Sequence, residues 1–361
     1  MTPCTDAGRS LRAAACGCLA IVICCLAAPG AAATHEAADP DHVSASERIS
    51  LPYGGQVRRE TAELTARMLA RLAVLHQVET VVAELTAVRF GLDDARRLTA
   101  LADMALPPVV STLPLPAEHA ASEQDESGTS LVTAQAEVSA PLSSLPGVVQ
   151  AVLARPDELE LQAEALSRAA QLAAEARELI RRAAIRQRQG PTYDSFVSRL
   201  THLDPQLRAM ERYMLLLDRF GAGWTPPTEA ESDLRDLQRL YPDNALINLG
   251  LAEALLRLDR PHEAVRFAGE ALRLEPGLAR ALYVRGMAQL QLRLSALATA
   301  DFSQALVLRP DKAAWWRARG AAHMIRRDYE SMCADLHQAC MLGDCAGLAE
   351  VRGQDLCIGR P

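Results

Sequence analysis

The stretch that decides the fold repeats itself: ALINLGLAEALLRLDRPHEAVRFAGEALRLEPGL (245–278), ARALYVRGMAQLQLRLSALATADFSQALVLRPDK (279–312) and AAWWRARGAAHMIRRDYESMCADLHQACML (313–342). Prolines and small residues recur in it with a constant repeat period of about 34 residues. They are Pro242, Pro276 and Pro310; Ala252, Gly286 and Gly320; Ala271, Ala305 and Ala339; and, less regularly, Ala264, Ala298 and Met332. A fixed period of this size is typical of a helical solenoid, in which each unit buries its apolar face against its neighbours.

Each repeat has the pattern of two amphipathic helices. In the first repeat, residues 245–258 and 261–274 carry apolar side chains at helical spacing. Pro261 suits the first turn of the second helix, where a backbone N–H has no partner to lose. The small residues at 252, 286 and 320 allow two helices to approach closely. The region is therefore predicted to be a stack of helix pairs.

These positions resemble the tetratricopeptide repeat family. The residues that carry the likeness are Ala252, Ala264, Ala271 and Pro276, then Gly286, Ala298, Phe302, Ala305 and Pro310, then Trp316, Gly320 and Ala339. Leu255 and Met332 depart from the pattern, since an aromatic and a small residue are usual there. The phase continues upstream through Ala230, Leu234, Leu237 and Pro242, with residues 210–221 as a degenerate first helix. The resemblance implies a C-terminal α-solenoid of three repeats and a decayed one, over roughly a third of the chain.

Members of this family bind peptides or helices in a concave groove formed by the first helices of the repeats. The resemblance places there Leu249, Glu253, Leu256, Arg280, Tyr283, Met287, Leu290, Arg317, Ala321 and Met324. We expect Leu256 and Leu290 to pack against neighbouring helices. The expected partner-binding residues are Glu253, Arg280, Tyr283, Met287 and Arg317. Among them, Arg280, Tyr283 and Arg317 are the strongest candidates, because exposed Tyr and Arg dominate binding energies.

The same resemblance indicates which ligand the groove does not take. Some family members clamp an acidic C-terminal tail with Lys, Asn and Arg on the first helices. The matching positions here are Leu249, Glu253, Val284, Ala314 and Ala318. None of these side chains donates the charged hydrogen bonds that a terminal carboxylate requires. The expected ligand is instead an apolar helix or extended segment, with an acidic residue near Arg280 and Arg317.

The N-terminal residues 1–33 have the pattern of a signal peptide. Arg9 and Arg12 precede an apolar run, residues 13–28, and small residues follow at 31–33. We expect cleavage near Thr34, with no lipid attached. Lipid modification of a cysteine is the alternative, but Cys24 and Cys25 lie inside the apolar run. This pattern predicts export to the periplasm or cell envelope of a Gram-negative-type bacterium, with no membrane span left after cleavage.

The part of the chain between the signal and the repeats is predicted to be mostly helical. Residues 34–55 are expected to be a disordered linker, residues 56–190 a coiled-coil-like helical domain, and residues 191–243 a helical connector with the degenerate repeat. Two long helices, 56–89 and 157–188, carry apolar seams, which predict either a hairpin within the chain or coiled-coil dimerisation. Residues 107–146 form either a β-hairpin or a flexible insertion.

Composition and motifs point to binding. The net charge of −7 disfavours nucleic acid as a partner. The sequence contains no glycine-rich phosphate loop, no two-histidine zinc helix and no nucleophile elbow, so we predict no enzyme activity and no cofactor. The predicted function is a scaffold or assembly factor that binds a partner protein. The alternatives are a structural spacer that acts through the long helices and an envelope enzyme without a recognisable motif.

Four cysteines follow the repeats: Cys333, Cys340, Cys345 and Cys357. In an oxidising compartment they predict two disulfides. Cys333 and Cys340 lie seven residues apart on one helix, about 10 Å between Cα atoms, which is too far for a bridge. A turn at residues 343–344 and a short helix running back would set Cys345 beside Cys340 and Cys357 near Cys333, so residues 344–361 form a stapled cap.

Two further features of this segment bear on the cysteines. Residues 339–345 resemble the turn of Sel-type helical repeats, in which a bridge staples consecutive helices. The alternative to disulfides is a metal site formed by Cys333, His337, Cys340 and Cys345.

Overall fold

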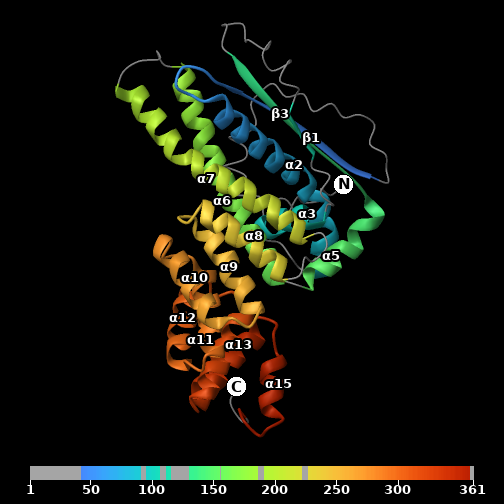
Figure 1. The fold of residues 1–361 in the computed structure, drawn as a ribbon. Coiled ribbons are helices and arrows are strands. Elements are labelled where there is room, and N and C mark those ends of the chain that lie inside the picture. The colour runs from blue at the N-terminus through green and yellow to red at the C-terminus, as the bar shows by residue number, and fades with distance from the viewer. Residues whose placement is uncertain are drawn as a thin grey trace, which may run out of the picture. The chain divides into compact units, whose positions relative to one another are not determined.

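The computed structural model describes residues 42–90, 95–105, 111–114, 130–154, 156–185, 191–221 and 227–357. The chain divides into two compact units, Met1–Trp224 and Thr225–Pro361, which are described separately (Figure 1). The predicted signal peptide lies outside the described residues. Within the described residues, no helix is both long enough and apolar enough to cross a membrane.

The first unit contains a small sheet and long helices. In chain order its elements are β1 (His42–Pro52), α2 (Arg59–Phe90), α3 (Ala95–Ala105), β2 (Ser111–Pro114), β3 (Leu131–Pro141), the 3-10 helix η1 (Leu142–Ser144), α5 (Leu145–Leu153), α6 (Pro156–Ile185) and α7 (Pro191–Gly221). The predicted hairpin is present, because β2 pairs with β3 in antiparallel register, Thr112 opposite Ala136. The loop between them lies outside the described residues.

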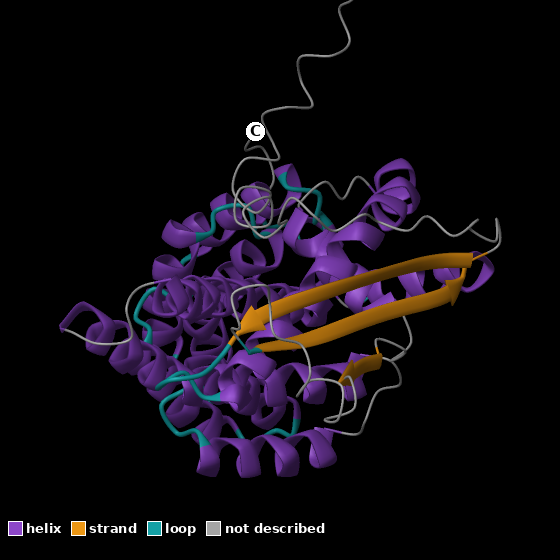
Figure 2. Cartoon of the chain, turned by 90° about the horizontal axis from the view of Figure 1, so that it is seen from above, coloured by secondary structure: helices purple, strands orange, loops and turns teal. Residues whose placement is uncertain are grey.

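The sheet has a third strand, which the sequence did not predict. β1 pairs with β3 along its whole length, in the order β1-β3-β2, and Figure 2 shows the two long strands side by side. The register sets Ile49 opposite Ala134 and Leu51 opposite Val132. All four of these side chains are buried, and β1 and β3 both pack on α2. The expectation that residues 34–55 form a disordered linker is therefore wrong for residues 42–52.

The long predicted helices are present as α2 and α6, and they pack against each other. α6 packs even more extensively along α7, which the sequence did not predict. The seam residues of α6 are buried by the chain's own elements; they are Leu159, Leu166, Ala169, Ala173, Ala176, Ile180 and Ala183. α7 is a single helix that continues through Pro205, so the expected separate helix over residues 210–221 is wrong.

The second unit is the predicted helical solenoid. Its helices are α8 (Pro227–Leu240), α9 (Ala245–Arg257), α10 (Pro261–Leu274), α11 (Ala279–Gln291), α12 (Ser295–Leu308), α13 (Ala313–Ile325), α14 (Tyr329–Met341) and α15 (Ala346–Arg352). The first helices begin at 245, 279 and 313 and the second helices at 227, 261, 295 and 329, so both series advance by the repeat period. Each helix packs mainly on the next along the chain, as stacking of repeats requires.

The close approach inside a repeat depends on glycine. A Cβ atom added to Gly286 would lie 2.7 Å from Cε1 of Phe302, so no larger residue fits there without a shift of the ring. This contact joins α11 to α12, and it confirms the expectation that the small residues of the repeat let its two helices meet.

The turns within the repeats also share one geometry. Asp259, Arg293 and Arg327 occupy the same position in consecutive repeats and have φ values of 56°, 63° and 61°. This left-handed conformation ends the first helix of each repeat.

Candidate interaction surface

The predicted groove residues form rows across the first helices, because equivalent positions recur once in every repeat. One row is Leu249, Tyr283 and Arg317, a second is Glu253, Met287 and Ala321, and a third is Leu256, Leu290 and Met324. Exposure rises along these rows. On α9, Leu249 and Glu253 are buried, whereas on α13 Arg317 is exposed and Met324 is 44% exposed. The most accessible part of the surface therefore lies on α11 and α13, and Leu256 is the half-buried residue that α9 adds to these rows.

Arg280 does not play the expected role. It is only 6% exposed, and its Nε and Nη2 donate to the two carboxylate oxygens of Glu253 at 2.6 and 3.2 Å. Glu253 is also buried, so the two charges neutralise each other away from water. The prediction that Arg280 and Glu253 are exposed contacts for a partner is wrong. The pair instead joins α9 of one repeat to α11 of the next.

Tyr283, Met287 and Leu290 are half-buried on α11. All three pack on a buried cluster of Ala298, Phe302, Ala318 and Ala322. The Tyr283 ring stacks on the buried Trp315 ring at a centroid distance of 5.2 Å and an interplanar angle of 13°. The tyrosine is thus held in place by its neighbours before any partner arrives. The sequence analysis missed Trp315, which supports this side chain from α13.

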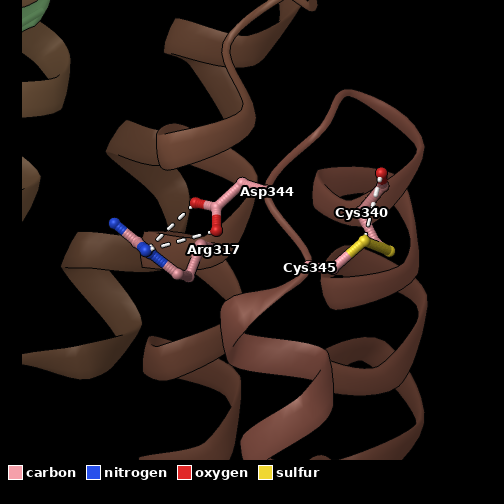
Figure 3. Close-up of a disulfide and its surroundings, with 4 residues drawn as sticks. All are labelled: Arg317, Cys340, Asp344 and Cys345. Atoms are coloured by element: carbon pink, nitrogen blue, oxygen red, sulfur yellow. Dashed lines mark hydrogen bonds and ion pairs between the residues drawn. A yellow bond between two sulfur atoms is a disulfide. The ribbon is translucent and has the colours of Figure 1, made fainter.

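Arg317 is the exposed cation of these rows. Its side chain is 48% exposed, and its Nη1 forms an ion pair with Oδ2 of Asp344 at 3.0 Å (Figure 3). Asp344 belongs to the loop between α14 and α15. Gly347 lies against the alkyl part of Arg317, where an added Cβ would be 3.4 Å from Cγ and Cδ. The C-terminal cap therefore reaches the edge of the candidate surface.

Two disulfides staple this cap, paired as the sequence predicted. Cys333 bonds to Cys357 and Cys340 bonds to Cys345, with Cα–Cα distances of 5.5 and 4.0 Å. Cys333 and Cys357 are buried in the cap core with Met332, Leu336, Leu348 and Val351.

The structure does not support the alternative metal site at Cys333, His337, Cys340 and Cys345, because the three sulfur ligands are oxidised. Over the described residues, no group of three His, Cys, Asp or Glu side chains could hold a metal ion.

The sequence analysis also missed a pair of matching ion pairs inside the repeats. Arg285 donates to both carboxylate oxygens of Asp301 at 2.7 Å, and Arg319 donates to those of Asp335 at 2.7 and 2.9 Å. Both carboxylates are buried. The hydrogen bond to Asp301 holds the pKa of Arg285 above its ordinary value. The sequence did contain a signal for these ion pairs. Arg319 and Asp335 occupy the same positions as Arg285 and Asp301, one repeat later.

Comparison with known proteins gives structural likenesses only. No family model and no curated protein matches the chain. A solved structure described as MamA RS-1 ArsTM double mutant is 15% identical, with a TM-score of 0.34, over 52% of this chain and 97% of that one. The APC/C hetero-tetramer Cut9-Hcn1 is 13% identical, with a TM-score of 0.37. That match covers 80% of this chain but only 48% of the other, so the chain spans about half of its length.

Proposed function

We propose that the repeat unit is a protein-interaction module, and that α11 and α13 bind an apolar segment of a partner protein. The observation that carries the proposal is a set of half-exposed apolar side chains on these helices. It takes members from all three rows, is called the apolar row from here on, and consists of Tyr283, Met287, Leu290 and Met324. Tyr283, Met287 and Leu290 pack on a buried cluster, so they offer contact area at a small entropic cost.

The charge at the edge of this surface sets the expected chemistry of the partner. Arg317 is the exposed cation beside the apolar row, and Arg280 is neutralised by Glu253. A partner segment that combines apolar side chains with one carboxylate near Arg317 complements both features. The role is that of a scaffold or assembly factor, and binding rather than catalysis.

A display selection on the full chain tests this proposal. A library of short random peptides is selected against the protein, and we expect the recovered peptides to share apolar residues flanking an Asp or Glu. Met324→Glu should abolish their binding because it places a charge in the apolar row. Val307→Glu is the matched control, since Val307 is 82% exposed on α12 and lies outside the row. Equal binding by both variants would contradict the proposed surface.

The spacer alternative predicts that the long N-terminal helices hold two chains together. The α6 seam that would serve this purpose is already buried within the first unit. Light scattering on the full chain separates the two functions. A monomer that still binds the selected peptides supports the interaction module, whereas a stable dimer without peptide binding supports the spacer.

We also propose that the protein works in an oxidising compartment outside the cytoplasm. The support is the pair of disulfides in the cap, since such bonds persist in secreted and periplasmic proteins. The apolar segment at residues 13–28 is the matching export signal in the sequence.

A further inference from the structure

We infer that the Cys340–Cys345 disulfide is a redox-labile clasp that keeps Asp344 on Arg317, and that its reduction makes Arg317 available to a partner carboxylate. The inference rests on the proposed function for its biological meaning. The clasp itself is a property of this chain, and it can be tested without any partner. The observations that carry it are the ion pair, the loop that positions Asp344, and the unequal burial of the two disulfides.

The carboxylate of Asp344 contacts the guanidinium of Arg317, the group that a partner carboxylate would bind in the proposed function. The recorded contacts run from a single nitrogen of Arg317, Nη1, to Oδ1 at 3.4 Å and Oδ2 at 3.0 Å of Asp344 (Figure 3). A guanidinium can bind a carboxylate with two parallel hydrogen bonds, so this end-on contact leaves the stronger geometry unused. An exposed ion pair of this kind contributes only about 0.2–1 kcal/mol, and a well-placed external carboxylate can therefore displace it.

The disulfide is one of the restraints that hold Asp344 in place. Cys345 follows Asp344 directly in the chain, and the bond to Cys340 closes a loop with four residues between the cysteines, 341–344. Within this loop the backbone N–H of Asp344 donates to the carbonyl of Ala339 at 2.9 Å, and Gly343 has a φ of 99°. Opening the bond returns conformational freedom to the loop, so the carboxylate spends less time on Arg317.

The two disulfides differ in their accessibility to a reductant. Cys345 is exposed and Cys340 is half-buried, whereas Cys333 and Cys357 are both buried in the cap core. Thiol–disulfide exchange requires that a thiolate reach a sulfur atom, so the outer bond reacts first. The inner bond and the packing of Leu348 and Val351 then keep α15 in place. Reduction at low concentration of reductant thus loosens one loop and leaves the cap folded.

Reduction of the Cys340–Cys345 disulfide needs an external dithiol, which is either a dithiol oxidoreductase or a chemical reagent. One of its thiolates attacks Sγ of Cys345, and the bond to Cys340 breaks as a mixed disulfide forms. Cys340 leaves as a thiolate and takes a proton from water. The second thiol of the reductant then attacks its own mixed-disulfide sulfur and releases Cys345. Two electrons have passed to the protein, and the reductant has become a disulfide.

The first measurement is alkylation of the full chain during mild reduction with dithiothreitol, followed by peptide mapping. We expect Cys340 and Cys345 to be alkylated well before Cys333 and Cys357. Equal rates for the two pairs would overturn the inference, because the clasp could not then open by itself.

The second measurement is the rate at which phenylglyoxal modifies Arg317. We expect about a two- to fivefold increase on reduction, the range that an exposed ion pair of this strength protects. Arg319 is the internal control, since its two bonds to Asp335 lie outside the loop. Asp344→Asn in the oxidised protein should give the same increase, with no further change on reduction. This variant keeps both disulfides and so avoids a folding defect. An unchanged rate at Arg317 in the reduced protein and in the variant would refute the clasp.

Binding of the display-selected peptides separates this inference from the proposed function. If reduction and Asp344→Asn both raise the reactivity of Arg317 and also strengthen peptide binding, both proposals are supported. If Arg317 becomes more reactive and peptide binding stays the same, the clasp stands, and the carboxylate at Arg317 must be removed from the proposed function.

Discussion

At the scale of single residues, Gly286 and Asp328 each set the position of a helix. The Cα hydrogen of Gly286 is in the place where any side chain would collide with Phe302. The carboxylate of Asp328 accepts a hydrogen bond from the backbone N–H of Ser331 and so caps α14. Neither residue belongs to the rows of the candidate surface, yet each fixes the position of a helix that carries this surface or its cap.

Gly286→Ala should destabilise the protein by about 1–3 kcal/mol, because the new methyl group overpacks the contact with Phe302. Gly269→Ala is the matched control. Gly269 lies on helix α10, and an added Cβ there meets nothing within 4 Å. Alanine should therefore stabilise that helix by up to about 1 kcal/mol. Urea unfolding of the two variants checks the opposite signs, and a loss of stability in both would contradict the packing argument.

The cap at Asp328 gives a pH dependence. Its hydrogen bond with Ser331 holds the pKa of the Asp328 carboxyl below its ordinary value of 3.8. A lowered pKa in the folded state stabilises the protein above the unfolded-state value, and this contribution is lost as the pH falls through the folded-state value.

Wild type should therefore be more stable than Asp328→Asn at pH 5, and the difference should disappear as the pH falls well below 3.8. Thermal unfolding between pH 5 and about pH 2.5 measures this difference in stability. A difference that does not depend on pH would show that the asparagine fails as a cap for another reason.

At the scale of helices and strands, the repeat period was the strongest signal in the sequence. It predicted the α10 bounds Pro261–Leu274 to the residue, because proline and small residues mark both the helix ends and the contacts between helices. Strand β1 was missed. Its buried residues Val43, Ile49 and Leu51 alternate with serine and charged residues, and only the packing on α2 shows which face is covered.

The role of Arg280 could not be predicted from the repeat pattern. Its partner Glu253 is 27 residues away and belongs to the preceding repeat. Whether the two charges meet depends on how closely consecutive repeats stack, and the spacing of apolar residues does not report this distance. By contrast, the disulfide pairing followed from the sequence in two steps. The rise of a helix excluded a bond between Cys333 and Cys340. The expected turn at residues 343–344 and the short helix after it then favoured Cys345 beside Cys340.

The matching ion pairs provide a test at the level of one repeat. Arg285 and Asp301 correspond, one repeat earlier, to the apolar pair Leu251 and Phe267. Arg285→Leu alone should cost about 3–5 kcal/mol, because it leaves the buried Asp301 carboxylate without its partner. The double change Arg285→Leu/Asp301→Phe copies the first repeat and should recover most of this loss. If the double variant is as unstable as the single one, the apolar pair does not fit the second repeat.

For the molecule as a whole, the two compact units carry different structural features. The first unit buries the long-helix seam that the sequence offered as a dimer contact, and the second carries the half-exposed row of the proposed module. The proposed export concerns the entire chain, since the compartment determines whether the cysteines of the second unit can be oxidised.

We predict that the protein isolated from its native cells begins near Thr34 and carries no lipid. The reason is the short apolar run followed by small residues at 31–33. Intact-mass measurement decides this. A mass that includes acyl chains on Cys24 or Cys25 would favour the lipid-anchored alternative, and a mass that includes residues 1–33 would show that the segment is retained.

The inner disulfide also has a mechanical consequence. Cys333 and Cys357 are 24 residues apart in the chain and 5.5 Å apart between Cα atoms. A tensile load applied at the C-terminus therefore passes through the S–S bond directly into α14, and the segment between the two cysteines carries none of it. With the bond closed, about 80 Å of contour length is withheld from extension. Residues 334–356 therefore cannot be pulled out by such a load until the Cys333–Cys357 bond is reduced.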